Sequence, residues 1–311
     1  MSLDTNAGTP EGDVRTDIQS ALMRRPAIVA ATAAALILLI SPPANSQSKP
    51  KAPKTPHLYV IDCGLLTMSA PQLFGFTKEE VGEKQPFAVP CYLVVHPKGT
   101  LMWDTGVIPD AQVNGQTQGI STVTKTLKAS LAEIGYKPAD ITYLGLSHLH
   151  SDHTANANDF AGSTWLVHQK ERDAMFAPPP PPGGRGGGGP MNTSFFDKLK
   201  DSKTKILTDA DYDVFGDGTV VIQYAPGHTP GHQILFLRLK ESGPILIAGD
   251  LYHLPQEITM HRFPSFEFDK AQSAVSREKV EAFLKSSGAR LWIEHDLATF
   301  TTLKKSPAYF D

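Results

Sequence analysis

The stretch that decides the fold is ITYLGLSHLHSDH, residues 141–153. Its first half is a nearly continuous apolar run, which predicts a strand buried on both faces. Imidazoles and a carboxylate crowd its second half, and such groups share a buried position only with a counter-charge, which a divalent cation supplies. A turn with this spacing aims His148 and His150 to one side and Asp152 and His153 to another, which suits two neighbouring metal ions.

Three further apolar runs, TVVIQYA, PILIAG and LWIE, lead into a metal-competent residue in the same way. These residues are His228, Asp250 and His295. Ligands of open α/β sheets gather at the carboxyl ends of strands, so we expect the four loops to converge. Five histidines and two aspartates fit a dinuclear site in which one carboxylate bridges both ions.

The pattern of short apolar runs predicts one mixed α/β domain over residues 57–311. A helix is expected over 121–134, closed by Gly135, and a second over 270–287, between an Asp269 N-cap and Gly288. The expected strands cover 58–62, 91–96, 99–104, 141–147, 163–168, 219–225, 233–239, 244–249 and 291–294.

The amino-terminal residues predict an exported protein. Residues 1–46 read as a signal peptide, because the apolar run 27–40 follows Arg24-Arg25 and small residues precede a cleavage point after Ser46. That run is too short to span a bilayer. A start at Met23 would give a more ordinary signal, so we suspect that translation begins there. The periplasm or the medium is the expected location.

Two low-complexity segments stand apart from the predicted core. Residues 47–56, QSKPKAPKTP, predict a mobile Pro/Lys linker. Residues 177–190 hold a run of prolines followed by glycines, which predicts a loop without fixed structure. That loop is either a tolerated surface insertion or a lid, and we favour the insertion.

Composition limits the partner classes. The chain has 311 residues, 41% of them hydrophobic, and a formal charge of −3. It has no basic stripe with interleaved aromatic residues, so a small molecule is the expected partner and nucleic acid is not. Cys63 and Cys91 are the only cysteines. An oxidising compartment would permit a disulfide between them, but two buried thiols fit the sequence equally well.

Five motifs together resemble the metallo-β-lactamase superfamily. They are LMWDTG (101–106), HLHSDH (148–153), APGHTPGHQ (225–233), LIAGDLYH (246–253) and IEHD (293–296). Within the superfamily the chain most resembles the N-acyl homoserine lactonases, which act in quorum quenching, and the likeness covers essentially all of 57–311. It implies an αββα sandwich of two mixed sheets with a dinuclear zinc site on one edge.

The resemblance also assigns the metal ligands. His148, His150 and His228 belong to the first ion; Asp152, His153 and His295 belong to the second, and Asp250 bridges them. Asp104 matches a position that supports the ligand loops, and His232 is expected to orient its neighbours. A hydroxide bridging two zinc ions would attack a substrate carbonyl, with Asp152 passing a proton.

The chain departs from the family pattern beside the bridging aspartate. Lactonases of this group carry a tyrosine three residues after it, whereas here Tyr252 comes second and His253 third. Either could assist catalysis, or both could be wall residues, and of the two we favour Tyr252. Segments 65–87 and 262–268 carry phenylalanines that either form an acyl slot or pack in the core.

The expected function is an exported dinuclear zinc hydrolase that opens a lactone ring, with N-acyl homoserine lactones as first choice. A β-lactamase is one alternative, although those enzymes generally lack the bridging aspartate. A glyoxalase-II-like thioesterase would keep all the ligands, but the 16 residues after His295 leave no room for its helical substrate domain. The non-enzyme alternative is a metal-stabilised binding module.

Overall fold

The computed structural model describes residues 49–178 and 193–311, and Gln47–Asp311 form one compact unit. The predicted signal peptide (1–46), the start at Met23 and most of the Pro/Gly loop (177–190) lie outside the described residues. Of the predicted linker, the described residues form neither helix nor strand, and Lys49 Nζ donates a hydrogen bond to the Asp140 carbonyl at 3.1 Å.

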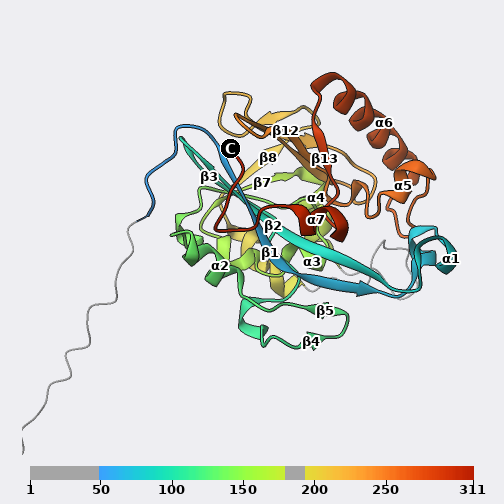
Figure 1. Ribbon diagram of the computed structural model, residues 1–311. Helices are drawn as coiled ribbons and strands as arrows, with labels where there is room; N and C mark the ends of the chain where they lie inside the picture. Colours follow the sequence, from blue (N-terminus) through green and yellow to red (C-terminus); the bar gives the residue numbers. More distant parts are fainter. Residues whose placement is uncertain (1–48, 179–192) are drawn as a thin grey trace, which may run out of the picture. The chain divides into compact units, whose positions relative to one another are not determined.

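Two mixed β-sheets form the centre of the molecule (Figure 1). The eight-stranded sheet has the order β4 (Thr117–Gln118), β5 (Ser121–Thr122), β1 (His57–Met68), β2 (Gln85–His96), β3 (Gly99–Trp103), β6 (Tyr143–Gly145), β7 (Thr164–His168) and β8 (Thr204–Leu207). The five-stranded sheet has the order β13 (Arg290–Trp292), β12 (Gly243–Ile247), β11 (Gln233–Leu239), β10 (Val220–Tyr224) and β9 (Tyr212–Asp213). Strands β3, β6, β7 and β8 run parallel, as do β12 and β13.

The helices lie outside the two sheets. They are α1 (Lys78–Val81), α2 (Leu127–Glu133), α3 (Ser151–Thr154), α4 (Gln169–Met175), α5 (Gln256–Thr259), α6 (Lys270–Ser287) and α7 (Leu297–Thr302). Figure 1 shows α6 and α2 on opposite sides of the paired sheets. No described helix is long and apolar enough to cross a membrane.

Three clusters of buried side chains correspond to three interfaces between layers. Trp103 and Val94 of the eight-stranded sheet pack with Leu235 and Ile245 of the five-stranded sheet between the two sheets. The outer face of the larger sheet buries side chains of α2 and α4, and the outer face of the smaller sheet buries Val280 of α6. This layering is the predicted αββα sandwich.

The helix predicted over 270–287 is confirmed as α6. The Asp269 carboxylate accepts hydrogen bonds from the amides of Ala271 and Gln272, and Gly288 ends the helix in the left-handed region at φ 67°. A cap of this kind stabilises a helix by about 1 kcal/mol. The helix predicted over 121–134 is shorter: Thr122 pairs with Leu65 in a strand, and the helix begins only after Thr126, whose side chain caps Ala129.

Cys63 and Cys91 form a disulfide between β1 and β2. Both cysteines are buried. The register of the two strands shifts between Asp62 and Leu65, and this irregularity places Cys63 within bonding reach of Cys91.

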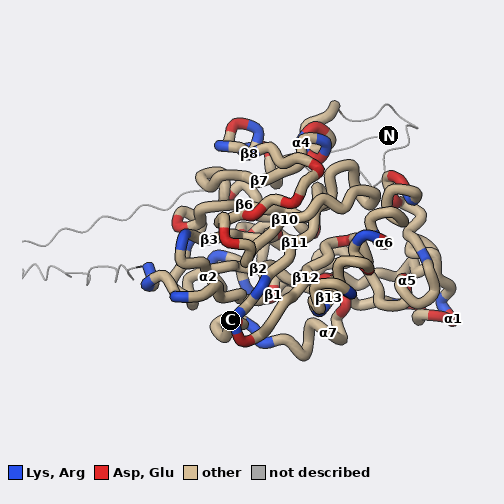
Figure 2. The backbone as a smooth tube through the Cα atoms, turned by 90° about the horizontal axis from the view of Figure 1, so that it is seen from above, with Lys and Arg blue, Asp and Glu red and all other residues tan. Residues whose placement is uncertain are grey.

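Basic and acidic residues are interspersed along the described chain, as Figure 2 shows.

Candidate metal centre

Four loops bring the predicted ligands to one edge of the two sheets. The loop after β6 carries His148 and His150, and α3 carries Asp152 and His153. The other ligands follow strands of the five-stranded sheet: His228 follows β10, Asp250 follows β12 and His295 follows β13. All seven side chains lie close together, as the strand-end argument predicts.

The first cluster consists of three imidazole nitrogens and one carboxylate oxygen. His150 Nδ1 lies 2.8 Å from His148 Nε2 and 3.0 Å from His228 Nε2. Asp250 Oδ2 lies 3.5 Å from His148 Nε2 and 3.4 Å from His228 Nε2. Four donor atoms therefore face one point, which is the donor number of a tetrahedral zinc site.

The second cluster shares Asp250 through its other oxygen. Asp250 Oδ1 lies 3.3 Å from His153 Nε2 and 3.1 Å from His295 Nε2. Asp152 Oδ2 lies 3.7 Å and 3.5 Å from the same two nitrogens. Because one oxygen of Asp250 faces each cluster, this carboxylate has the geometry of a bridging ligand between two cations.

The chemistry of these donors fits divalent cations. His153 Nε2 and Asp250 Oδ1 are buried without a hydrogen-bond partner among the described residues, which is costly unless an ion satisfies them. Burial lowers the pKa of His150 and of His228 to about 3, and that of His148 well below its usual value. These imidazoles are therefore neutral, which is the form that ligates metals.

Carboxylates and carbonyls orient the ligand rings. Asp104 Oδ2 accepts a hydrogen bond from His153 Nδ1 at 2.9 Å, and its Oδ1 accepts from the Ser147 amide at 2.7 Å. His295 Nδ1 donates to the Ala88 carbonyl at 2.8 Å. Asp104 thus contacts a ligand and its loop, which is the supporting position expected from the sequence.

His232 and Gly249 hold the backbone of the bridging aspartate. His232 Nε2 accepts a hydrogen bond from the Asp250 amide at 3.0 Å, while its Nδ1 donates to the Ala225 carbonyl. Gly249 has φ 51°, and a Cβ there would lie 2.7 Å from His232 Nε2. Any side chain at this position would push the His232 ring away from Asp250.

The structure places His253, and not Tyr252, beside the predicted ligands. The Tyr252 ring is packed in the core under α6, 4.5 Å from the Arg277 guanidinium, and its hydroxyl has no partner among the described residues. His253 instead faces the centre, with Nε2 3.1 Å from Asp250 Oδ2. The turn at Gly249–Leu251 reorients the chain so that the residue three positions after Asp250 faces the ligands.

A buried ion pair lies behind His253. Glu257 Oε1 is 3.2 Å from His253 Nδ1, and Glu257 Oε2 is 2.5 Å from Arg277 Nη2. Burial lowers the pKa of His253, but Asp250 and Glu257 raise it more, to about 10. The two carboxylates therefore favour the protonated form of the His253 ring.

Three buried glutamates were missed by sequence reasoning: Glu171, Glu257 and Glu294. Glu171 and Glu257 lie in short helices whose polar pattern gives no signal of burial. Glu294 directly precedes the ligand His295, and its Oε1 accepts a hydrogen bond from Trp103 Nε1 at 3.4 Å. Burial raises the pKa of Glu294 well above its usual value. The motif IEHD contained this residue, but the sequence did not show which way it points.

Aromatic rings and a cavity surround the centre. Phe87 stacks on His295 with ring centroids 5.1 Å apart, while Phe74 and Phe266 lie edge-on to His253 at 5.1 and 5.7 Å. A cavity of about 550 Å³ is bounded by His295 itself and by residues such as Leu254 and Leu297. Phe87 and Phe266 therefore pack against the ligand rings of His295 and His228, and Phe74 packs against His253. Phe263 instead lies on the Arg277 guanidinium, and Phe268 is exposed.

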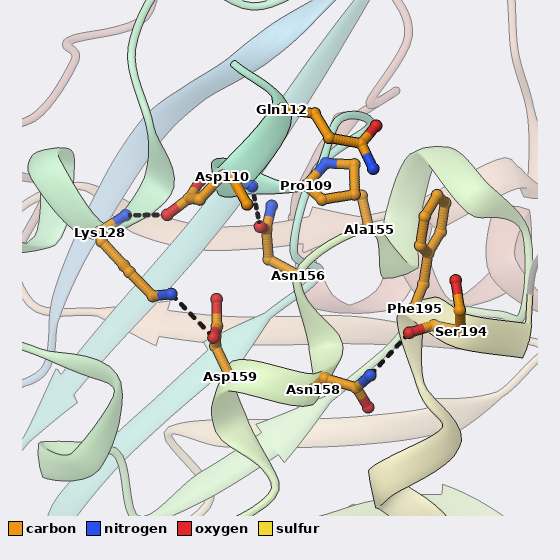
Figure 3. A pocket seen from close by; sticks show the side chains of 11 residues that line it. Pro109, Asp110, Gln112, Lys128, Ala155, Asn156, Asn158, Asp159, Ser194 and Phe195 are labelled. Atoms are coloured by element: carbon orange, nitrogen blue, oxygen red, sulfur yellow. Dashed lines mark hydrogen bonds and ion pairs between the residues drawn. The ribbon is translucent and has the colours of Figure 1, made fainter.

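A second hollow, of about 230 Å³, lies away from the ligands. Figure 3 shows its polar side chains paired with one another: Lys128 with Asp159, and Asn156 with the Asp110 amide. None of its lining residues is a predicted ligand. These contacts identify it as a structural feature of the surface beside α2, and the candidate centre remains the histidine cluster.

Comparison with known proteins identifies the family of the chain. Residues 85–286 match the family model of the metallo-beta-lactamase superfamily. The match spans more than half of the chain, so the protein belongs to the metallo-β-lactamase superfamily.

Within the superfamily, the proteins similar to this chain include several lactonases. N-acyl homoserine lactonase AttM of Azorhizobium caulinodans is 30% identical over 241 residues, which are 74% of this chain and 90% of that protein. N-acyl homoserine lactonase AiiA of Bacillus thuringiensis subsp. kurstaki is 26% identical over 235 residues, 70% of this chain and 85% of that protein. The chain therefore groups with the N-acyl homoserine lactonases and is a metal-dependent hydrolase acting on ester bonds.

Solved structures show the same fold. The crystal structure of a quorum-quenching N-acyl homoserine lactone lactonase matches with a TM-score of 0.67 and 25% identity, covering 81% of this chain and 97% of that one. A second such hydrolase, with the product N-hexanoyl-L-homoserine bound at its catalytic metal centre, matches with a TM-score of 0.65 at 24% identity, covering 81% and 98%. Both matches cover nearly the whole solved chain, so the αββα domain is shared from end to end.

Proposed function

We propose that this protein is an exported dinuclear zinc lactonase that opens the ring of N-acyl homoserine lactones. The observation that carries the proposal is Asp250, whose two oxygens face the two ligand clusters. A carboxylate in this position distinguishes two-metal hydrolysis from chemistry at a single ion. The lactonases named above, which the chain matches over most of their length, support the substrate class.

The reaction adds water across the ester bond of the ring. Water adds to the carbonyl carbon, the bond from that carbon to the ring oxygen breaks, and the ring oxygen leaves as a hydroxyl after taking up a proton. Two bound zinc ions supply a nucleophile near neutral pH and polarise the carbonyl oxygen. The product is the open N-acyl homoserine.

Asp152 and His253 are the residues placed to handle protons and charge. The Asp152 side chain is 18% exposed and lies between the second cluster and solvent, so its carboxylate can carry a proton from the attacking water to the ring oxygen. His253 Nε2 is directed at the centre, and its N–H can donate a hydrogen bond to a substrate oxygen. Glu257 Oε1 accepts a hydrogen bond from the His253 amide and lies 3.2 Å from Nδ1, which holds this residue in place.

The surroundings favour a substrate with an apolar part. Phe74, Phe87 and Phe266 exclude water from the ligand rings on one side. The cavity beside His295 presents aliphatic surface from Leu254 and Leu297 where an acyl group can be accommodated. An acyl lactone combines the reactive ester and the apolar chain that such a site requires.

The disulfide between Cys63 and Cys91 supports export. Structural disulfides persist in oxidising compartments such as the periplasm and are rare in the cytosol. Fractionation of cells that express the full chain, combined with amino-terminal sequencing of the mature protein, tests this part of the proposal. Mature protein that is confined to the cytosol and still carries the residues before Ser46 would refute it.

Three substrates separate the proposed function from its alternatives. Purified protein of measured metal content is assayed with N-acyl homoserine lactones, a chromogenic cephalosporin and S-lactoylglutathione, alongside Asp250→Ala. We expect two metal ions per chain, lactone opening by the unaltered protein, and loss of activity by at least about 10²-fold in the variant. A metal-loaded protein that opens no lactone refutes the substrate, and an active protein with fewer than one ion per chain refutes the dinuclear site.

A further inference from the structure

Glu171 of α4 is a fully buried carboxylate outside the ligand set. Its side chain is 2% exposed. Oε1 accepts a hydrogen bond from the Leu149 amide at 2.7 Å, and Oε2 accepts from Thr229 Oγ1 at 2.8 Å and from the Gly231 amide at 2.7 Å. Within residues 49–178 and 193–311, no lysine or arginine pairs with it.

These three contacts join the segment between His148 and His150 to the loop after His228, next to all three imidazoles of the first cluster. The first of these segments then continues into α3, which carries Asp152 and His153. Leu149 lies between His148 and His150, and Thr229 directly follows His228. One carboxylate thus links the backbone that supplies all three imidazoles of the first cluster. The second cluster has supports of its own, Asp104 on His153 and the Ala88 carbonyl on His295. Asp104 also accepts a hydrogen bond from the Ser147 amide beside His148, so it contacts both parts of that loop.

We propose that Glu171 is a positioning residue that sets the cation affinity of the His148, His150 and His228 cluster separately from that of the second cluster. The inference rests on the proposed metal centre. It follows from the position of the contacts, because Leu149, Thr229 and Gly231 flank ligands of the first cluster, and Leu149 precedes the start of α3.

Two further observations agree with this role. A Cβ at Gly231 would lie 2.4 Å from the Glu171 backbone nitrogen, so the backbones of α4 and the His228 loop are in contact and no side chain fits at position 231. Burial raises the pKa of Glu171 to about 7, against three hydrogen bonds that lower it. If position 171 served packing alone, a neutral side chain would be more stable there. A side chain that holds the three donors of Leu149, Thr229 and Gly231 needs two acceptor oxygens, as glutamate has.

The test is Glu171→Gln, with Asp173→Asn as the matched control. Asp173 lies on the same helix, is exposed, and bonds only the Gln169 side chain among the described residues. Glutamine has one acceptor oxygen, and its NH₂ group opposes the amide hydrogens of Leu149 or Gly231. Zinc affinities are measured by chelator competition, and long-range ¹H–¹⁵N NMR of the imidazoles identifies which histidines bind each ion.

We expect Glu171→Gln to weaken binding at the first cluster at least tenfold, with the second cluster and the control variant unchanged. Equal weakening at both clusters, or no change, would overturn the proposal. Thr229→Val removes one of the three contacts and provides the same readout if the glutamine variant does not fold. Because no substrate is used, a protein that binds two ions and opens no lactone refutes the proposed substrate and leaves this test intact.

Discussion

Removal of the Cys63–Cys91 disulfide is expected to destabilise the fold by about 3–4 kcal/mol. The bonded residues are 28 positions apart, and the chain-entropy relation for a loop of that length gives about 3.6 kcal/mol at 25 °C. For a domain of this size, that loss lowers the melting temperature by about 10 °C.

Urea unfolding measures this difference directly. Three samples are compared: the oxidised protein, the protein reduced under denaturing conditions, and the double variant Cys63→Ala/Cys91→Ala. We expect the oxidised protein to have the highest free energy of unfolding, and reductant to leave the double variant unchanged. The reduced protein isolates the cross-link from the cavity that alanine leaves. Reduced and oxidised proteins within about 1 kcal/mol of each other would refute the entropic argument.

Three further substitutions test the interior of the site. Glu257→Gln leaves the buried Arg277 guanidinium without its carboxylate partner, and it should lower the free energy of unfolding, measured in urea, by about 3–5 kcal/mol. Adding Arg277→Met should restore most of this loss, and an unchanged urea midpoint in the glutamine variant would contradict the prediction. Tyr252→Phe removes a hydroxyl that has no partner among the described residues, so kcat should stay within about twofold. His253→Phe should lower kcat by about 10²-fold. A large loss of kcat in the tyrosine variant would show that Tyr252 takes part in the reaction. The pKa of Glu171 rises from 4.5 to about 7 on folding, so in the metal-free protein its contribution to stability is present below pH 4.5 and lost by pH 7. Relative to Glu171→Gln, the unaltered protein should lose about 3 kcal/mol across that window, and parallel stability curves would exclude this titration.

The convergence of the seven predicted ligands could be foreseen because strand ends are visible in a sequence. Each apolar run stops where the sheet stops, and a histidine or aspartate there has little room to point elsewhere. Local signals also located α6, because the Asp269 side chain caps the first turn of the helix and Gly288 adopts the left-handed conformation that ends it.

The remaining features depend on contacts between distant segments. The Cys63–Cys91 bond depends on a register shift in β1, and the choice of His253 over Tyr252 depends on the turn at Gly249. Neither event has a local signature. Glu171 is equally hidden, because its partners Leu149 and Thr229 lie 22 and 58 positions away along the chain.

The order of the ligands along the chain determines when the centre can acquire its metal. The eight-stranded sheet supplies His148 to His153, and the five-stranded sheet supplies His228, Asp250 and finally His295. A nascent chain that ends before Asp250 holds histidines for one ion but no bridge, and the second ion has a full ligand set only after His295 has emerged. The complete set of predicted ligands is therefore available only after nearly the entire domain has been synthesised. If the chain is exported before it folds, as proposed above, its site would be filled from the metal pool of its destination, and that compartment would decide which cation the enzyme carries.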